Sequence, residues 1–187
     1  MDYSTTRGLA AFELTWQKLD VKTQQVAELL SLFAPDVIPW RLVQSIFEKL
    51  NWNKSNIKKA KKQLYKHYLV QNLEDKESSY KIHSLIRQFL QIKLGLSLSA
   101  LEFKRAFATE MLSIAKQIPN IHTVLDIEKV KDAIPHLEEV VENLIHVVED
   151  EDVFWAFTGI ARFYQGKGLY TLAEPWSQGC VSVIKTR

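Results

Sequence analysis

The chain has 187 residues, of which 47% are apolar and 25% charged, and its formal net charge is +2. These values exclude a disordered chain and a strongly basic nucleic-acid coat protein. The single cysteine, Cys180, excludes a disulfide framework and a cysteine-rich zinc site. No stretch is apolar enough for a membrane span, and the first residues contain no secretory signal, so we expect a cytoplasmic protein with no membrane partner.

Helical spacing of apolar residues predicts helices near 9–19, 21–33, 39–50 and 54–66. Asp20 is a suitable cap for the second of these helices, Pro39 for the start of the third, and Asn53 or Ser55 for the fourth. Strands are predicted at 69–73 and 80–82, with a charged turn between them, and a helix follows over 84–94. Helices followed by a two-stranded hairpin are the order of a winged helix.

The rest of the chain predicts helices alone. Amphipathic patterns cover 100–118, a segment that begins at Pro135, a segment that ends at Gln165, and 170–184. The expected fold class is therefore mainly α, with one small two-stranded β-hairpin.

Charge is divided unevenly along the chain. Residues 1–96 hold 15 Lys or Arg and 9 Asp or Glu, a net charge of +6, whereas residues 97–187 hold 9 and 13, a net charge of −4. Gly and Ser interrupt the helical pattern at the change. We predict a tail at 1–8, a winged-helix domain at 9–95, a linker at 96–100 and a second, helical domain at 101–187.

Residues 154–184 match the tetratricopeptide pattern, in which small residues let two antiparallel helices approach closely. We expect Gly168 to supply the turn and the two tyrosines to fill gaps beside the small residues. The expected packing residues are Phe157, Ile160, Ala161, Tyr164, Gly168, Tyr170 and Ala173. An ordinary helical hairpin is the alternative interpretation of this single copy.

Several segments together resemble a known family, the bacterial NB-ARC proteins of the STAND class of signalling NTPases. The segments are 9–16 (LAAFELTW), 29–34 (LLSLFA), 38–40 (IPW), 80–90 (YKIHSLIRQFL), 134–140 (IPHLEEV) and 161–176 (ARFYQGKGLYTLAEPW). The resemblance implies a winged helix joined to the start of a tetratricopeptide array. It also implies a regulatory role, in which the winged helix packs on a nucleotide-binding domain rather than on DNA.

No nucleotide-binding domain is recognisable in this sequence. A P-loop requires Gly-Lys followed by Ser or Thr, and the single Gly-Lys pair, Gly166-Lys167, is followed by Gly168. The resemblance implies that the chain is the middle of a larger STAND protein or a free-standing relative. It also makes His83 a nucleotide sensor, although Ser84 stands where the family usually has Asp. A capping or packed histidine is the other interpretation of His83.

The helix predicted at 54–66 is strongly basic, and no acidic residue occurs between Asn51 and Leu73. This face is a candidate for binding nucleic acid or an acidic partner through Lys54, Lys58, Lys59, Lys61, Lys62 and Lys66. Arginine is missing from the helix, so few residues are suited to reading bases. A solvated face, or one docked on an acidic neighbour, is the alternative.

No combination of residues predicts catalysis. The five histidines lack metal-ligand spacing, and Cys180 falls at a small-residue packing position. We therefore expect no enzyme activity, no catalytic residue, no metal and no cofactor.

An apolar stripe on the last predicted helix would face a following repeat in an array. It predicts protein docking or self-association through residues 170–184, at Trp176, Cys180, Val181, Val183 and Ile184. The leading hypothesis is a non-catalytic regulatory and protein-interaction module. The alternative is a winged-helix transcriptional regulator that binds nucleic acid through the basic helix.

Overall fold

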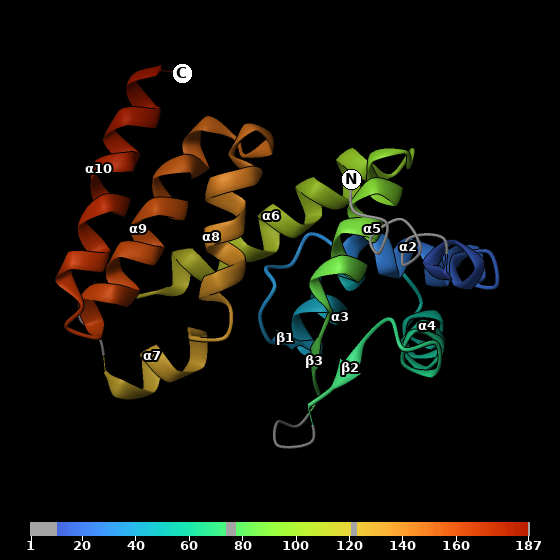
Figure 1. Cartoon of the computed structure of the whole chain (residues 1–187). Coiled ribbons are helices and arrows are strands. Elements are labelled where there is room, and N and C mark those ends of the chain that lie inside the picture. The colour runs from blue at the N-terminus through green and yellow to red at the C-terminus, as the bar shows by residue number, and fades with distance from the viewer. Residues whose placement is uncertain (1–10, 74–77, 121–122, 187) are drawn as a thin grey trace. The chain divides into compact units, whose positions relative to one another are not determined.

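The computed structural model describes residues 11–73, 78–120 and 123–186. The described chain is mainly helical, with one small three-stranded antiparallel sheet (Figure 1). Contacts divide the chain into two compact units, Met1–Phe103 and Lys104–Arg187. The predicted helical fold class is thereby confirmed. Among the described helices, none combines the length and apolar character that crossing a bilayer requires.

Unit 1 contains the three strands of the sheet and the helices that surround them in the chain. Its elements are α2 (Val21–Leu30), β1 (Ile38–Pro39), α3 (Trp40–Lys49), α4 (Lys54–Lys66), β2 (Gln71–Asn72), β3 (Ser79–Lys81) and α5 (Ser84–Gly95). The side chains of Asp20, Asn53 and His83 cap α2, α4 and α5, because each accepts a hydrogen bond from a free amide of the first turn. The capping roles predicted for Asp20 and Asn53 are confirmed.

The sheet has three strands rather than the two predicted. Its order is β1-β3-β2, and Tyr80 of β3 lies opposite Ile38 on one side and Asn72 on the other. The prediction missed β1 because a two-residue strand that ends in proline shows no alternation of apolar and polar residues. With β1 in place, the β2–β3 hairpin is attached to the segment that enters α3.

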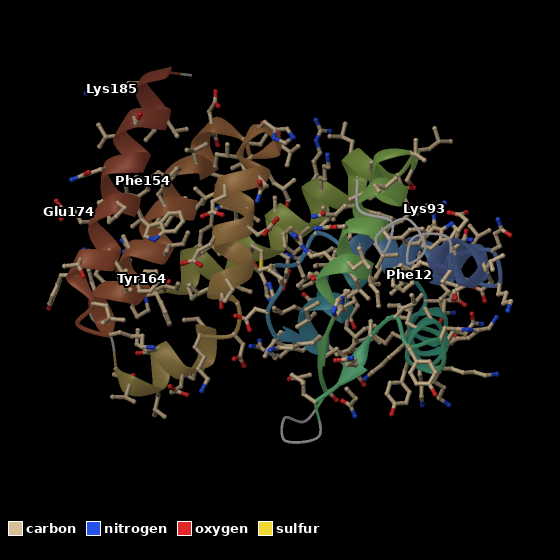
Figure 2. The ribbon with its side chains drawn as sticks, in the orientation of Figure 1. Phe12, Lys93, Phe154, Tyr164, Glu174 and Lys185 are labelled. Atoms are coloured by element: carbon tan, nitrogen blue, oxygen red, sulfur yellow. The ribbon has the colours of Figure 1, made fainter. Side chains whose placement is uncertain are left out.

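The core of unit 1 lies between α2, α3, α4 and α5, and α2 packs against both α4 and α5. The largest fully buried side chains of these helices and their flanks include Leu29, Leu30, Phe33, Ile46, Phe47, Ile57, Leu64 and Leu90. Residues 11–16 are also helical and pack on α5. Lys93 lies 2.7 Å from Glu13 Oε2, and Phe12 lies 5.9 Å from Phe89 between ring centroids (Figure 2).

Helix α6 (Ala100–Gln117) follows a turn at residues 96–99, and the boundary between the contact units falls within it, after Phe103. Unit 2 continues with α7 (Val124–Val130), α8 (Ile134–Asn143), the short 3₁₀ helix η1 (Ile145–Val147), α9 (Asp150–Gly166) and α10 (Tyr170–Thr186). Pro135 lies in the first turn of α8, where its missing N–H costs no hydrogen bond.

Helices α9 and α10 lie side by side as an antiparallel hairpin (Figure 1). Gly168 makes the turn with a φ of 73°, a conformation that glycine adopts at little cost. The expected packing residues Phe157, Ile160, Ala161 and Ala173 are buried, as is Cys180.

The expectation that Tyr170 packs between the two helices is wrong, because its side chain is 69% exposed. It is the first residue of α10, and helical side chains lean toward the N-terminus of their helix. A ring with this exposure does not fill a gap between helices.

Candidate functional site

Helix α4 presents exposed lysines at a spacing of four residues. Lys58, Lys62 and Lys66 are all exposed, which agrees with one shared face. No ion pair or hydrogen bond within the described parts of the chain engages these three ammonium groups. Among the described residues, nothing competes with an anionic partner for them.

The other predicted lysines of α4 have partners in unit 1. Lys59 lies 2.8 Å from Asp20 Oδ2, and Lys54 lies 2.9 Å from Glu48 Oε1. The ammonium of Lys61 lies 5.0 Å from the ring centroid of Trp40 and 4.6 Å from that of Tyr80. The structure therefore divides the six predicted lysines into three that have a partner in unit 1 and three that have none among the described residues.

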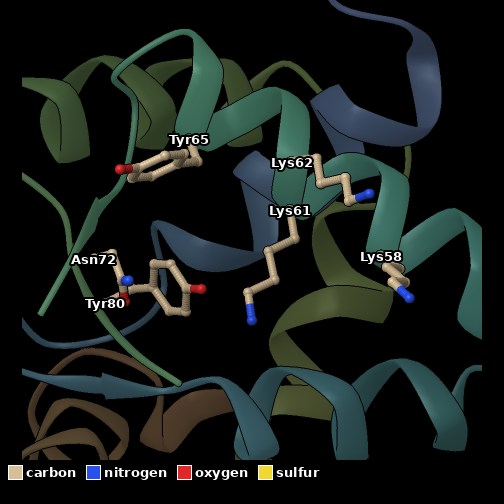
Figure 3. Close-up of a pocket in the computed structure, with 6 residues that line it drawn as sticks. All are labelled: Lys58, Lys61, Lys62, Tyr65, Asn72 and Tyr80. Atoms are coloured by element: carbon tan, nitrogen blue, oxygen red, sulfur yellow. The ribbon is translucent and has the colours of Figure 1, made fainter. Parts of the chain in front are cut away.

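An open pocket of about 360 Å³ lies between α4 and the β2–β3 hairpin. Figure 3 shows Lys58 and Lys62 on one side of this pocket, Lys61 pointing toward Tyr80, and Tyr65 with Asn72 on the other side. We call it the lysine–tyrosine pocket, with lining residues Lys58, Lys61, Lys62, Tyr65, Asn72 and Tyr80. Its described lining holds three lysines and no carboxylate.

The sequence pattern did not predict Tyr65, Asn72 or Tyr80 as site residues. Tyr65 comes three residues after Lys62, so helical spacing could have placed it beside the lysines. Asn72 and Tyr80 join the pocket through the pairing of β2 with β3, and this register is not visible in the apolar pattern.

His83 lies between β3 and α5 and caps that helix. Its Nδ1 accepts a hydrogen bond from the Leu85 amide at 3.3 Å, and the side chain is exposed. The capping interpretation of His83 is therefore confirmed.

A second surface lies in unit 2, where α9 and α10 line an open groove of about 500 Å³. Phe154, Val181 and Ile184 are exposed by 47%, 53% and 52%, and Figure 2 labels Phe154 on α9. We call this the apolar groove. Its further lining residues are Asn120, Thr158, Ala161, Arg162, Gln165, Ser177 and Cys180.

The predicted interface residues of α10 are therefore only partly brought together. Cys180, Val181 and Ile184 line the apolar groove, whereas Trp176 and Val183 are half-buried and do not line it. Burial raises the pKa of the Cys180 thiol, which makes it a weak nucleophile.

The described residues contain no group of three or more His, Cys, Asp and Glu that could hold a metal ion. Of the two histidines in and after α8, His136 is fully buried and His146 is exposed. The acidic residues of the first turn of α9 (Asp150, Glu151 and Asp152) stabilise the positive end of the helix dipole.

A comparison with protein families matches part of unit 1. Residues 14–97 match a family described as a domain of unknown function (DUF7779). The match covers most of unit 1 and stops before α6. No curated protein matches the chain. No solved structure matches it either.

Proposed function

We propose that this chain is a non-catalytic regulatory module that binds protein partners through the apolar groove of unit 2. The observation that carries the proposal is the exposure of Phe154, Val181 and Ile184 around one open groove. Exposed apolar side chains that gather on one surface are typical of protein-interaction sites.

We further propose that unit 1 is a winged helix and that α9–α10 is a tetratricopeptide-like helix pair. The order α2-β1-α3-α4-β2-β3-α5 supports the first assignment, with α3 and α4 as the helix-turn-helix and β2–β3 as the wing. The buried small residues Ala161, Ala173 and Cys180, with the Gly168 turn, support the second.

The resemblance to STAND signalling proteins supports a regulatory role for such a module. In that role, unit 1 packs on a nucleotide-binding domain and unit 2 begins a partner-binding array. The proposed compartment is the cytoplasm, since a single cysteine supplies no intrachain disulfide.

A photo-crosslinking amino acid placed at position 181 tests the proposed groove. In cells, it should trap one defined protein or a second copy of the chain. The same amino acid at Val124, which is 79% exposed on α7, is the matched control. The trapped protein, once purified, should bind the chain, and Val181→Glu should weaken that binding about tenfold, or roughly 1.4 kcal/mol. Crosslinks no stronger at 181 than at 124 would contradict the proposal.

A second candidate function is the binding of duplex DNA, favoured by Lys58, Lys62 and Lys66, which are exposed and have no ion pair with any described residue. Fluorescence anisotropy with a labelled duplex at low and high salt tests it. Binding that falls steeply with salt and is lost in the triple Lys→Glu variant would support this function. Salt-independent binding, or none, would contradict it.

A further inference from the structure

We propose that the lysine–tyrosine pocket binds a single nucleotide unit, either free or within a single strand of nucleic acid. The phosphate lies against the lysines and the base against Tyr65. The site is separate from the apolar groove. It shares Lys58 and Lys62 with the duplex-binding candidate, and the experiment below distinguishes the two.

The charge of the pocket points to a phosphate. Lys58, Lys61 and Lys62 line it, and its described lining contains no carboxylate. Lys61 is partly buried, and within the described residues its ammonium contacts only the rings of Trp40 and Tyr80. An ammonium has three N–H donors, and among the described residues none of those of Lys61 donates to an oxygen, so they suit the oxygens of a bound anion.

The aromatic side of the pocket points to a base. Tyr65 is 56% exposed, a large exposure for an aromatic residue on a helix that buries its other apolar side chains. Sites that bind single strands combine a positive groove with aromatic rings on which bases stack. The exposed amide of Asn72 supplies both a donor and an acceptor for a base edge.

The size of the pocket favours one nucleotide over a duplex. A volume of about 360 Å³ lies at the lower end of the range for pockets that enclose small ligands. A stacked and paired base cannot lie against Tyr65 inside such a pocket, whereas an unpaired base can. A simple solvated lysine face would require neither the exposed ring nor the concave shape.

The test uses the full chain and a fluorescently labelled single strand of ten nucleotides in an anisotropy titration. Tyr65→Ala should weaken binding about 5- to 150-fold, the range for loss of one base–aromatic stack. Tyr65→Phe should retain most of the affinity. The double variant K58Q/K62Q should reduce the salt slope by about 1.4, because each contacted phosphate contributes about 0.7 on single strands.

Two variants outside the pocket serve as matched controls. Lys66→Gln removes an exposed lysine of α4 that does not line the pocket. Tyr68→Asn removes a ring that is 84% exposed, and asparagine tolerates the φ of 57° at this position. Both controls should bind the labelled strand with an affinity within about twofold of the parent, far less than one lost stack.

Competition experiments against the labelled strand show whether the pocket binds a free nucleotide or a nucleotide within a strand. If a mononucleotide displaces the strand and inorganic phosphate at the same concentration does not, the pocket also binds free nucleotides. If the unlabelled strand displaces the labelled one and a mononucleotide does not, the pocket binds a nucleotide only as part of a single strand. Equal displacement by inorganic phosphate overturns the inference, as does binding that Tyr65→Ala leaves unchanged. Duplex binding that depends on Lys66 as strongly as on Lys58 also overturns it, in favour of the duplex candidate.

Discussion

Asp20 and Lys59 join the start of α2 to the middle of α4, with Oδ2 of the aspartate 2.8 Å from Nζ of the lysine. The same carboxylate caps α2, because Oδ1 accepts a hydrogen bond from the Thr23 amide at 2.8 Å. Gln63 of α4 also donates to Oδ2, at 3.2 Å. One side chain therefore joins α2 to α4 at two points, Lys59 and Gln63, and gives Lys59 a partner within unit 1.

Replacing this carboxylate should destabilise unit 1. Asp20→Ala removes a helix cap and should lower the free energy of unfolding by about 0.5–2 kcal/mol at pH 7. Asp20→Asn keeps the capping oxygen and should lose less. Urea denaturation of the parent and both variants measures the difference, and equal stability of the parent and Asp20→Ala would contradict the capping role.

The same group should make stability depend on acid. The hydrogen bond from Lys59, followed by that from the Thr23 amide, lowers the pKa of Asp20 to about 2. The unfolded chain therefore takes up this proton at a higher pH than the folded chain, so stability falls as the pH drops toward about 2. The stability gap between the parent and Asp20→Asn should narrow from pH 6 to pH 3. If the stability difference between the parent and Asp20→Asn stays constant, other carboxylates cause the loss of stability in acid.

Tyr164 of α9 should stabilise unit 2 through α8. Its hydroxyl donates to Glu138 Oε1 at 2.7 Å. Hydrogen bonds to charged groups are worth about 1.5–3 kcal/mol, so Tyr164→Phe should lose an amount in this range. Tyr170→Phe is the control, since this ring is 69% exposed and should change stability by less than about 0.5 kcal/mol.

This hydroxyl should also make stability fall in alkali. Burial, and then the Glu138 carboxylate, raise the pKa of Tyr164 well above its usual value. The unfolded state loses the phenol proton first, so stability falls as the pH rises above about 10. Tyr164→Phe lacks this loss. Its deficit relative to the parent should therefore shrink between pH 9 and pH 11, and an unchanged deficit would be inconsistent with the assignment.

Local rules in the sequence predict most of the helices. Asp20 and Asn53 stand at the positions where capping chemistry requires them, and the apolar spacing identifies the buried faces. The structural features that the sequence did not predict depend on residues that are distant in the sequence. Strand β1 exists because Ile38 pairs with Tyr80, and Lys61 is partly buried because Trp40 and Tyr80 lie beneath it.

One candidate site could be predicted from local spacing, whereas the other depends on contacts between distant parts of the chain. Exposed Lys58, Lys62 and Lys66 follow from helical spacing alone. The lysine–tyrosine pocket does not, because it requires the register of β2 on β3 to bring Asn72 and Tyr80 beside α4. Exposure of Tyr170 depends on the position of the first turn of α10, which a repeat pattern does not specify.

Pro175 should cost α10 stability. It lies inside the helix, where it removes a backbone hydrogen bond and crowds the preceding turn. Pro175→Ala should raise the stability of unit 2, by up to about 3 kcal/mol. Thermal unfolding followed by circular dichroism measures the change, and a lower melting temperature would show that the ring makes contacts worth more than the bond it removes.

Gly159 should be the least replaceable glycine among those described in the helices. A Cβ built there would lie 2.7 Å from the Ala115 Cβ and 3.0 Å from its Cα, so α9 approaches α6 too closely for a methyl group. The colliding atoms cannot rotate away, because they belong to the backbone or are fixed to it. Crowding costs about 1–3 kcal/mol, which outweighs the gain of about 1 kcal/mol that alanine brings to a helix.

Gly95 provides the matched control for this substitution. It ends α5, and a Cβ there would meet no atom within 4 Å. Gly95→Ala should therefore leave the protein as stable as the parent, or up to about 1 kcal/mol more stable, whereas Gly159→Ala should lower the urea midpoint. If both variants gained stability, α9 would have room to move away from α6, and the close contact at Ala115 would not limit the packing of unit 2.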